Sequence, residues 1–228
     1  MFAPAQRRSQ TRELAVLGLL YLIQNSNAEM LRLGASSPAA RQAGASSGNA
    51  VASWSFVLAN HVHPLAMVLF GFWLTGMAAV LIRGRRLPRW AFDVPGLWFT
   101  LRLLAEYITI NGLIFEGSKV PPGMLLVQIV LYLPFFVITW GWIFQRLDSV
   151  GQQEPGQVVQ LIDAVPSRGI TPFDYYHSSI STLLNKGKPT IVGVSRNGRL
   201  LVLLYLAMVL GLYALTFARI LQLTRAVI

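Results

Sequence analysis

The feature that most constrains this chain is a set of apolar runs long enough to cross a lipid bilayer. An α-helix rises about 1.5 Å per residue, so about 20 apolar residues span the roughly 30 Å hydrocarbon core. Runs of this length occupy residues 62–82, 124–145 and 200–221. Only 12% of the residues are charged, whereas soluble domains carry about 25%. We therefore expect an all-α integral membrane protein with several passes.

Four crossings are predicted, three of them in residues 51–146 at about 62–82, 96–115 and 124–145. The second contains Arg102 and Glu106, which are four residues apart and so lie on one helix face. Ionisable side chains are costly in a bilayer and usually face a protein interior. We expect a structural intramembrane pair that Asn111 extends. A role in gating or ion passage, or a misplaced span boundary, are the alternatives.

The N-terminal region, residues 1–50, has a basic start and an apolar run of ten residues at 14–23, too short to span. It predicts a surface or interfacial helix, with a signal segment as the alternative. Residues 34–50 are small and polar, which is typical of a flexible linker. Residues 147–171 are expected to be a polar connecting loop.

The formal net charge is +10, and the arginines flank the apolar runs. Anionic lipid headgroups are therefore the expected partner, and nucleic acid is not. If both termini are cytoplasmic and loop 83–89 is outside, eight basic residues lie inside and ten outside. Cytoplasmic loops normally carry the excess of Lys and Arg, so this count leaves the orientation open.

An amphipathic segment, a turn and a spanning helix follow one another in residues 172–223. The segment PFDYYHSSISTLL predicts a short helix, for which Asp174 is a suitable N-cap. Its small hydroxylated residues suit close packing among neighbouring helices. We expect His177 to be a packing residue, with pH sensing as the alternative. The candidate residues on this helix are Tyr176, His177, Ser178, Ser181 and Thr182.

Residues 174–221 resemble the pore module of the potassium-channel-like ion channel family, especially small bacterial members with extra helices before one pore loop. Residues 175–183 stand where the pore helix would be, and Gly187-Lys188-Pro189-Thr190 stands where that family has Gly-Tyr-Gly-Asp. Ser195 and Arg199 match the pattern after the filter, and Gly211 matches a hinge of the inner helix. The resemblance implies a homotetramer in a bacterial plasma membrane that handles an inorganic ion.

The filter-like turn departs from that family at its functional atoms. Its residues are Asn185, Lys186, Gly187, Lys188, Pro189 and Thr190. A potassium filter replaces the water shell of the ion with backbone carbonyls, but Pro189 fixes φ where the family has a flexible glycine. Four copies would bring up to eight lysine ammonium groups to the axis, where two charges about 6 Å apart repel by roughly 3 kcal/mol.

This degenerate selectivity filter argues against ordinary potassium conduction. A gated or anion-tolerant pore remains, as does a non-conducting scaffold or accessory subunit that retains the pore fold. A small membrane enzyme or transporter is a weaker alternative.

Other chemistry-bearing residues give weaker signals. His61 and His63 are two apart, and we expect interfacial histidines, with a metal site as a minor alternative. The serines near 178 lack an identifiable histidine–carboxylate partner, so no enzyme activity is expected. The absence of cysteine excludes disulfides and thiolate metal sites. Neither a metal nor a cofactor is expected.

Overall fold

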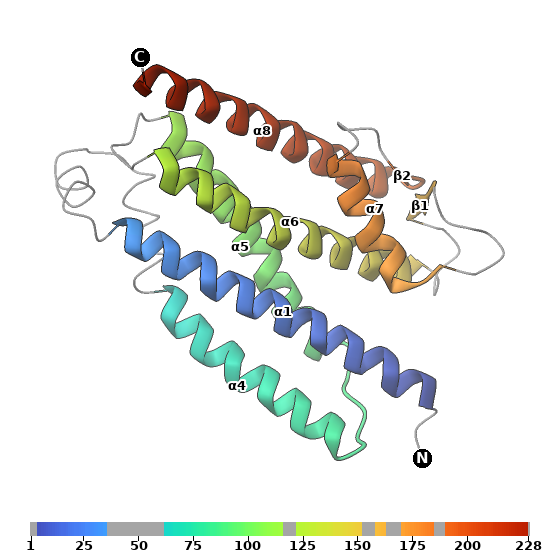
Figure 1. Ribbon diagram of the computed structural model, residues 1–228. Helices are drawn as coiled ribbons and strands as arrows, with labels where there is room; N and C mark the ends of the chain where they lie inside the picture. Colours follow the sequence, from blue (N-terminus) through green and yellow to red (C-terminus); the bar gives the residue numbers. More distant parts are fainter. Residues whose placement is uncertain are drawn as a thin grey trace. The chain divides into compact units, whose positions relative to one another are not determined.

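The protein is described from a computed structural model that defines residues 4–35, 62–115, 122–151, 158–162, 170–184 and 190–227. The chain is mostly helical (Figure 1). Its elements in order are α1 (Pro4–Ala35), α4 (His63–Ile82), α5 (Trp90–Phe115), α6 (Pro122–Gly151), β1 (Val159–Leu161), α7 (Pro172–Leu184), β2 (Ile191–Gly193) and α8 (Arg196–Val227).

Within this described part, three helical segments are long and apolar enough to cross a membrane: His63–Ile82, Ile129–Asp148 and Arg196–Ala218. This supports a membrane-embedded protein. The expected crossing at 96–115 forms part of α5 but is not one of these three segments, and it carries Arg102 and Glu106 near its middle. The four-span topology is therefore not established by the helices alone.

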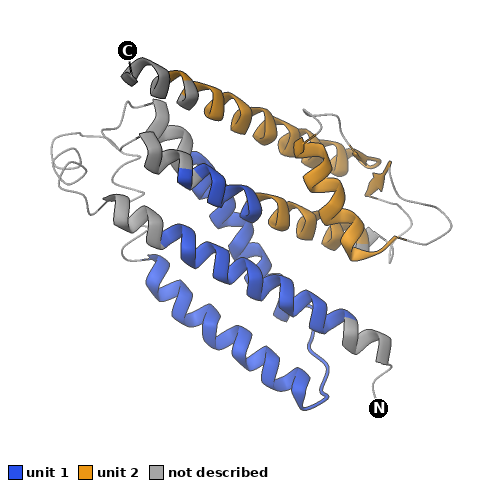
Figure 2. Cartoon of the chain, viewed as in Figure 1, with its two compact units in different colours: residues 1–135 blue, residues 136–228 orange. Residues whose placement is uncertain are grey.

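The chain divides into two compact units, residues 1–135 and residues 136–228, with the boundary inside α6 (Figure 2). Helix α6 continues through Pro134 and ends at Gly151.

In unit 1, α1 runs antiparallel to α4. Tyr21 on α1 donates a hydrogen bond to Met67 O at 3.1 Å. A Cβ atom added at Gly71 would lie 3.0 Å from Tyr21 Oη, so the glycine allows the two helices to approach closely. Leu17 and Leu20 of α1 are fully buried. The N-terminal helix that the sequence predicts as surface or interfacial is continuous over 32 residues and has a buried face within this unit.

Helix α5 is antiparallel to α4, because Phe70 stacks on Trp98 at 5.4 Å while Trp73 meets Trp90 at 5.7 Å. The first half of α6 completes the unit, where Tyr132 donates to Leu103 O at 3.1 Å.

The histidine predictions fall at the other end of α4: His63 begins the helix and is buried, while His61 lies outside the described residues.

Unit 2 is built on an aromatic cluster between α6 and α8. Tyr205 of α8 stacks on Phe136 at 5.5 Å and lies 5.2 Å from Trp140 and 5.5 Å from Phe144. All four rings are buried. Aromatic pairs of this kind each contribute about 0.5–1.5 kcal/mol beyond their buried area, so the cluster fixes α8 against α6.

The all-α prediction is wrong in one respect, because β1 and β2 form an antiparallel ribbon in which Gln160 faces Val192. Gly193 and Gly198 are required where this ribbon meets α8, since a Cβ at Gly198 would collide with Val158 O and one at Gly193 with the backbone of α8. The β-branched residues of 158–162 and 190–194 carry a strand signal, and 158–162 lies in the segment that was expected to be a polar connecting loop. Residues 36–50 of the predicted linker, and the segment 51–61 that follows it, lie outside the described residues.

Candidate functional site

Helix α7 is fixed at its N-terminus by hydrogen bonds between Thr171 and Asp174. Asp174 Oδ2 accepts hydrogen bonds from Thr171 N at 2.6 Å and Thr171 Oγ1 at 2.8 Å. Pro172 occupies the first helical position, where its missing N–H costs nothing. The N-cap is thus Thr171, and the prediction of Asp174 as the cap residue is wrong by three positions. Asp174 instead lies in the first turn and accepts a hydrogen bond from the N–H of the cap residue, which is one half of a capping box.

The first turn of α7 also packs on the end of α6. Tyr175 Oη donates to the Asp148 carboxylate, and Tyr176 Oη donates to Gln145 Oε1 at 3.0 Å. A Cβ at Gly141 would collide with the ring of Tyr176. Burial, and next the hydrogen bond and charge of Asp148, raise the pKa of Tyr175 well above its ordinary value. Tyr175 therefore stays a neutral hydrogen-bond donor.

The last turns of α7 pack on α8. Tyr205 Oη donates to Ser179 O at 2.6 Å, and Tyr213 Oη donates to Leu183 O. Tyr213 is 17 residues beyond Arg196, which corresponds to about 25 Å along α8. The C-terminal end of α7 therefore lies beside the apolar segment Arg196–Ala218, far from the first residue of α8.

Beyond α7 the chain returns alongside the same helix. Thr190 N donates to Thr182 Oγ1 at 3.1 Å, the two threonine hydroxyls are 2.8 Å apart, and Thr190 Oγ1 donates to Ser178 O at 2.7 Å. All three residues are buried. Ile162 N donates to Thr190 O at 2.9 Å, which joins this return to the β ribbon. Thr190 is thus held against the last turns of α7.

The predicted site residues divide into three groups. Ser178, Thr182 and Thr190 come together, with Ser181 half-buried on the same helix. His177 is exposed within this chain, so the packing role expected for it is not found there. Helix α8 passes through Gly211 without interruption. The remaining turn residues, Asn185, Lys186, Gly187, Lys188 and Pro189, lie outside the described residues.

Ser195 begins α8 as its N-cap, because its hydroxyl accepts a hydrogen bond from Gly198 N at 3.0 Å. This gives the serine of the post-filter pattern a local structural role.

A second polar cluster lies inside unit 1. Arg102 Nη2 and Glu106 Oε1 are 3.2 Å apart, and both residues are 4% exposed. The Asn27 amide of α1 faces the Glu106 carboxyl, and Gln24 is fully buried one helical turn earlier. Neither polar atom of the Gln24 side chain has a hydrogen-bond partner among the described residues.

Arg102 and Glu106 form the ion pair that their four-residue spacing predicts, whereas the sequence reasoning did not identify the amides of α1. The sequence signal for these amides is that Gln24 and Asn27 lie three residues apart, and so on one helix face, directly after the apolar run 14–23. Asn111, proposed to extend this polar face, has no described side chain. No group of three or more His, Cys, Asp or Glu side chains able to hold a metal occurs among the described residues.

Comparison with protein-family models, with curated proteins and with solved structures finds no match to this chain.

Proposed function

We propose that the protein is a channel-like integral membrane protein in which the end of α6, α7 and α8 form a pore-like module. It assembles as a homotetramer and transports an inorganic ion by a route other than an ordinary potassium filter. A bacterial plasma membrane is the proposed location. The observation that carries the proposal is the contact of the C-terminal end of α7 with Tyr213, inside the apolar segment of α8.

The geometry supports a re-entrant helix as follows. Helix α7 starts beside Asp148, the last residue of the apolar segment of α6, and ends beside the apolar segment of α8. The bonds of Thr190 then lead the chain back along α7. Non-helical backbone at membrane depth is tolerated only where protein buries it or where it lines a water-filled cavity. A turn at the tip of α7 fits a pore-lining position.

The exposed side of α7 supports self-assembly. Phe173, Ile180 and Leu184 are large apolar residues that stay exposed in the single chain, Leu184 at 70%. In a tetramer these side chains would contact neighbouring copies around the axis.

The composition of the turn determines which ion is expected. Lys186 and Lys188 are two of only three lysines in the chain, and Pro189 prevents the backbone freedom that a potassium filter needs. Rings of lysine are found in pores that pass anions. We therefore expect permeability to chloride to exceed permeability to potassium.

Planar-bilayer recording of the purified protein tests this function. The charge-reversing double variant Lys186→Glu/Lys188→Glu should shift the reversal potential toward cation selectivity. The matched control is Lys119→Glu, which changes the only other lysine and should leave selectivity unchanged. A robust potassium-selective current in the unaltered protein would refute the degenerate-filter reasoning.

A non-conducting scaffold or accessory subunit is the second candidate, and the presence of Pro189 in the turn favours it. Native mass measurement in detergent, together with the bilayer recording, distinguishes the two candidate functions. A tetramer with current supports the channel, whereas a monomer, or a complex with a different protein and no current, supports the accessory subunit.

A further inference from the structure

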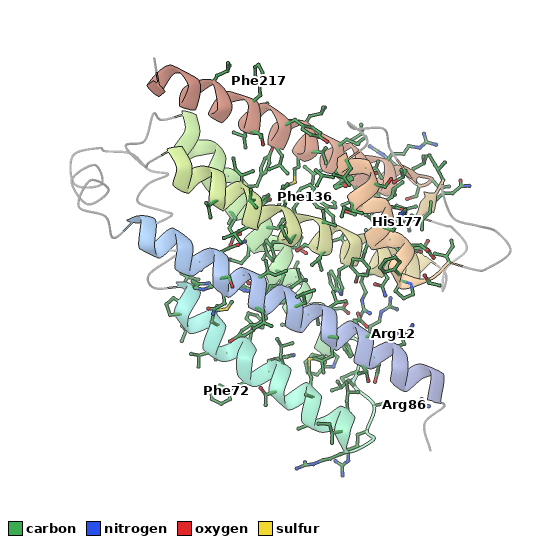
Figure 3. All side chains as sticks on the ribbon, in the orientation of Figure 1. Arg12, Phe72, Arg86, Phe136, His177 and Phe217 are labelled. Carbon is green, nitrogen blue, oxygen red and sulfur yellow. The ribbon has the colours of Figure 1, made fainter. Side chains whose placement is uncertain are left out.

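The structure brings two groups of arginines, far apart in the sequence, to one end of unit 1. Gln10 Nε2 on α1 donates to Leu87 O at 2.9 Å, and Leu87 N donates to Gln10 Oε1 at 3.4 Å. This paired contact joins the first turns of α1 to the loop between α4 and α5 (Figure 3, where Arg12 and Arg86 are labelled). We call this the basic end; its arginines are Arg7, Arg8, Arg12, Arg83, Arg85, Arg86 and Arg89.

The loop has a defined backbone that directs its arginines outward. Gly84, with φ of 72°, ends α4 in a Schellman motif, in which Gly84 N donates to Leu81 O at 3.0 Å and Arg85 N to Val80 O at 3.1 Å. Arg83, Arg85 and Arg86 are exposed. Their guanidinium groups are therefore presented by an ordered turn.

Unit 1 is strongly polarised in charge along α4. The residues near the basic end include seven arginines and two carboxylates, Glu13 and Asp93. At the opposite end, the described ends of α1, α4 and α5 carry one arginine, Arg32, and one carboxylate, Glu29. The excess positive charge of these helices is thus confined to a single end.

The basic end also lies at the boundary of an apolar segment. Loop 83–89 follows directly on Ile82, where the candidate span of α4 ends. Trp90 is 58% exposed and makes an edge contact with Trp73, whose Nε1 donates to Ala91 O at 3.0 Å. Tryptophans are enriched at the level of lipid headgroups, where the phosphates lie.

We propose that the basic end is a binding surface for anionic phospholipid headgroups of the cytoplasmic leaflet, so that the N-terminus of α1 and loop 83–89 both face the cytoplasm. Guanidinium groups bind phosphate in a bidentate manner, and anionic lipids attract basic segments at that leaflet. This replaces the sequence-based arrangement in which the N-terminal arginines and the loop lie on opposite sides. It goes beyond the proposed function and does not depend on ion transport.

The orientation is tested with single cysteines, because the chain has none of its own. Ser9 and Ser26 are exposed residues of α1, 17 positions and about 25 Å apart, so Ser9→Cys and Ser26→Cys are a matched pair. A membrane-impermeant maleimide should label Ser9→Cys in inverted membrane vesicles and not in intact cells. Ser26→Cys should not be labelled in inverted vesicles while remaining unlabelled in intact cells. Labelling of Ser9→Cys in intact cells overturns the proposal.

Lipid binding is tested by native mass spectrometry after purification with equal amounts of phosphatidylglycerol and phosphatidylethanolamine. The triple variant Arg83→Gln/Arg85→Gln/Arg86→Gln should bind phosphatidylglycerol about fivefold more weakly for each arginine removed. The corresponding Arg→Lys triple keeps the charge and should retain most of the preference. Equal binding of both lipids by the unaltered protein overturns the inference. Displacement of phosphatidylglycerol by equimolar inorganic phosphate also overturns it, since it would indicate a site for free anions.

Discussion

The contacts that Thr190 makes with α7 through Thr182 and Ser178 give a quantitative test of the packing in unit 2. Thr190→Val keeps the shape of the side chain but removes the bond to Ser178 O and the bond between the two hydroxyls. At about 0.5–1.5 kcal/mol for each bond, the free energy of unfolding should fall by about 1–3 kcal/mol. Thr182→Val removes the acceptor of Thr190 N and leaves that buried N–H unpaired, for a loss of about 2–4 kcal/mol.

The double variant distinguishes a true pair from two separate effects. Both substitutions remove the same hydroxyl–hydroxyl bond, so the double variant should lose about 1 kcal/mol less than the two single losses added together. Unfolding is followed by circular dichroism during titration of detergent-solubilised protein with sodium dodecyl sulfate. The control is Thr216→Val, whose hydroxyl bonds Leu212 O within its own helix, and which should change stability by no more than about 0.5 kcal/mol.

Two results would refute the reasoning. One is a loss for both single variants no larger than that of Thr216→Val. The other is additivity of the two losses to within about 0.3 kcal/mol, which would mean that the threonines do not interact.

Two further perturbations test the polar contacts of each unit. Arg102→Met leaves the Glu106 carboxylate unpaired in a buried site and should lower the free energy of unfolding by about 3–5 kcal/mol, whereas adding Glu106→Met should recover most of that loss. The same detergent titration measures both variants. A double variant no more stable than Arg102→Met contradicts a paired role. Because the pKa of Tyr175 is raised in the folded protein, its contribution to stability is full below about pH 10 and is lost as the pH rises further. Unfolding titrations between about pH 9 and 11 should therefore show a shallower fall in stability for Tyr175→Phe than for the unaltered chain. Identical slopes would show that Tyr175 is not buried against Asp148.

Several features of the candidate site were predictable from the sequence because they depend on local patterns. The short helix before the turn follows from the amphipathic spacing of 172–184, and the pairing of Arg102 with Glu106 follows from their four-residue separation. The exposure of His177 was not predictable, because it depends on which side of α7 meets α6 and α8. The bonds of Thr190 to Thr182 and Ser178 were not predictable either, since they join positions eight and twelve residues apart in the sequence.

By itself, the sequence determined the membrane class, the apolar segments and the order of a short helix followed by a long apolar helix near the C-terminus. Those properties follow from composition and from short-range periodicity, which each segment carries on its own. Only the tertiary structure decided that α1 lies antiparallel to α4, which brings the N-terminal arginines to loop 83–89 and makes a single basic end. It also decided that the tip of α7 meets Tyr213. Both depend on contacts between residues 30 to 77 positions apart, for which no local pattern in the chain is sufficient.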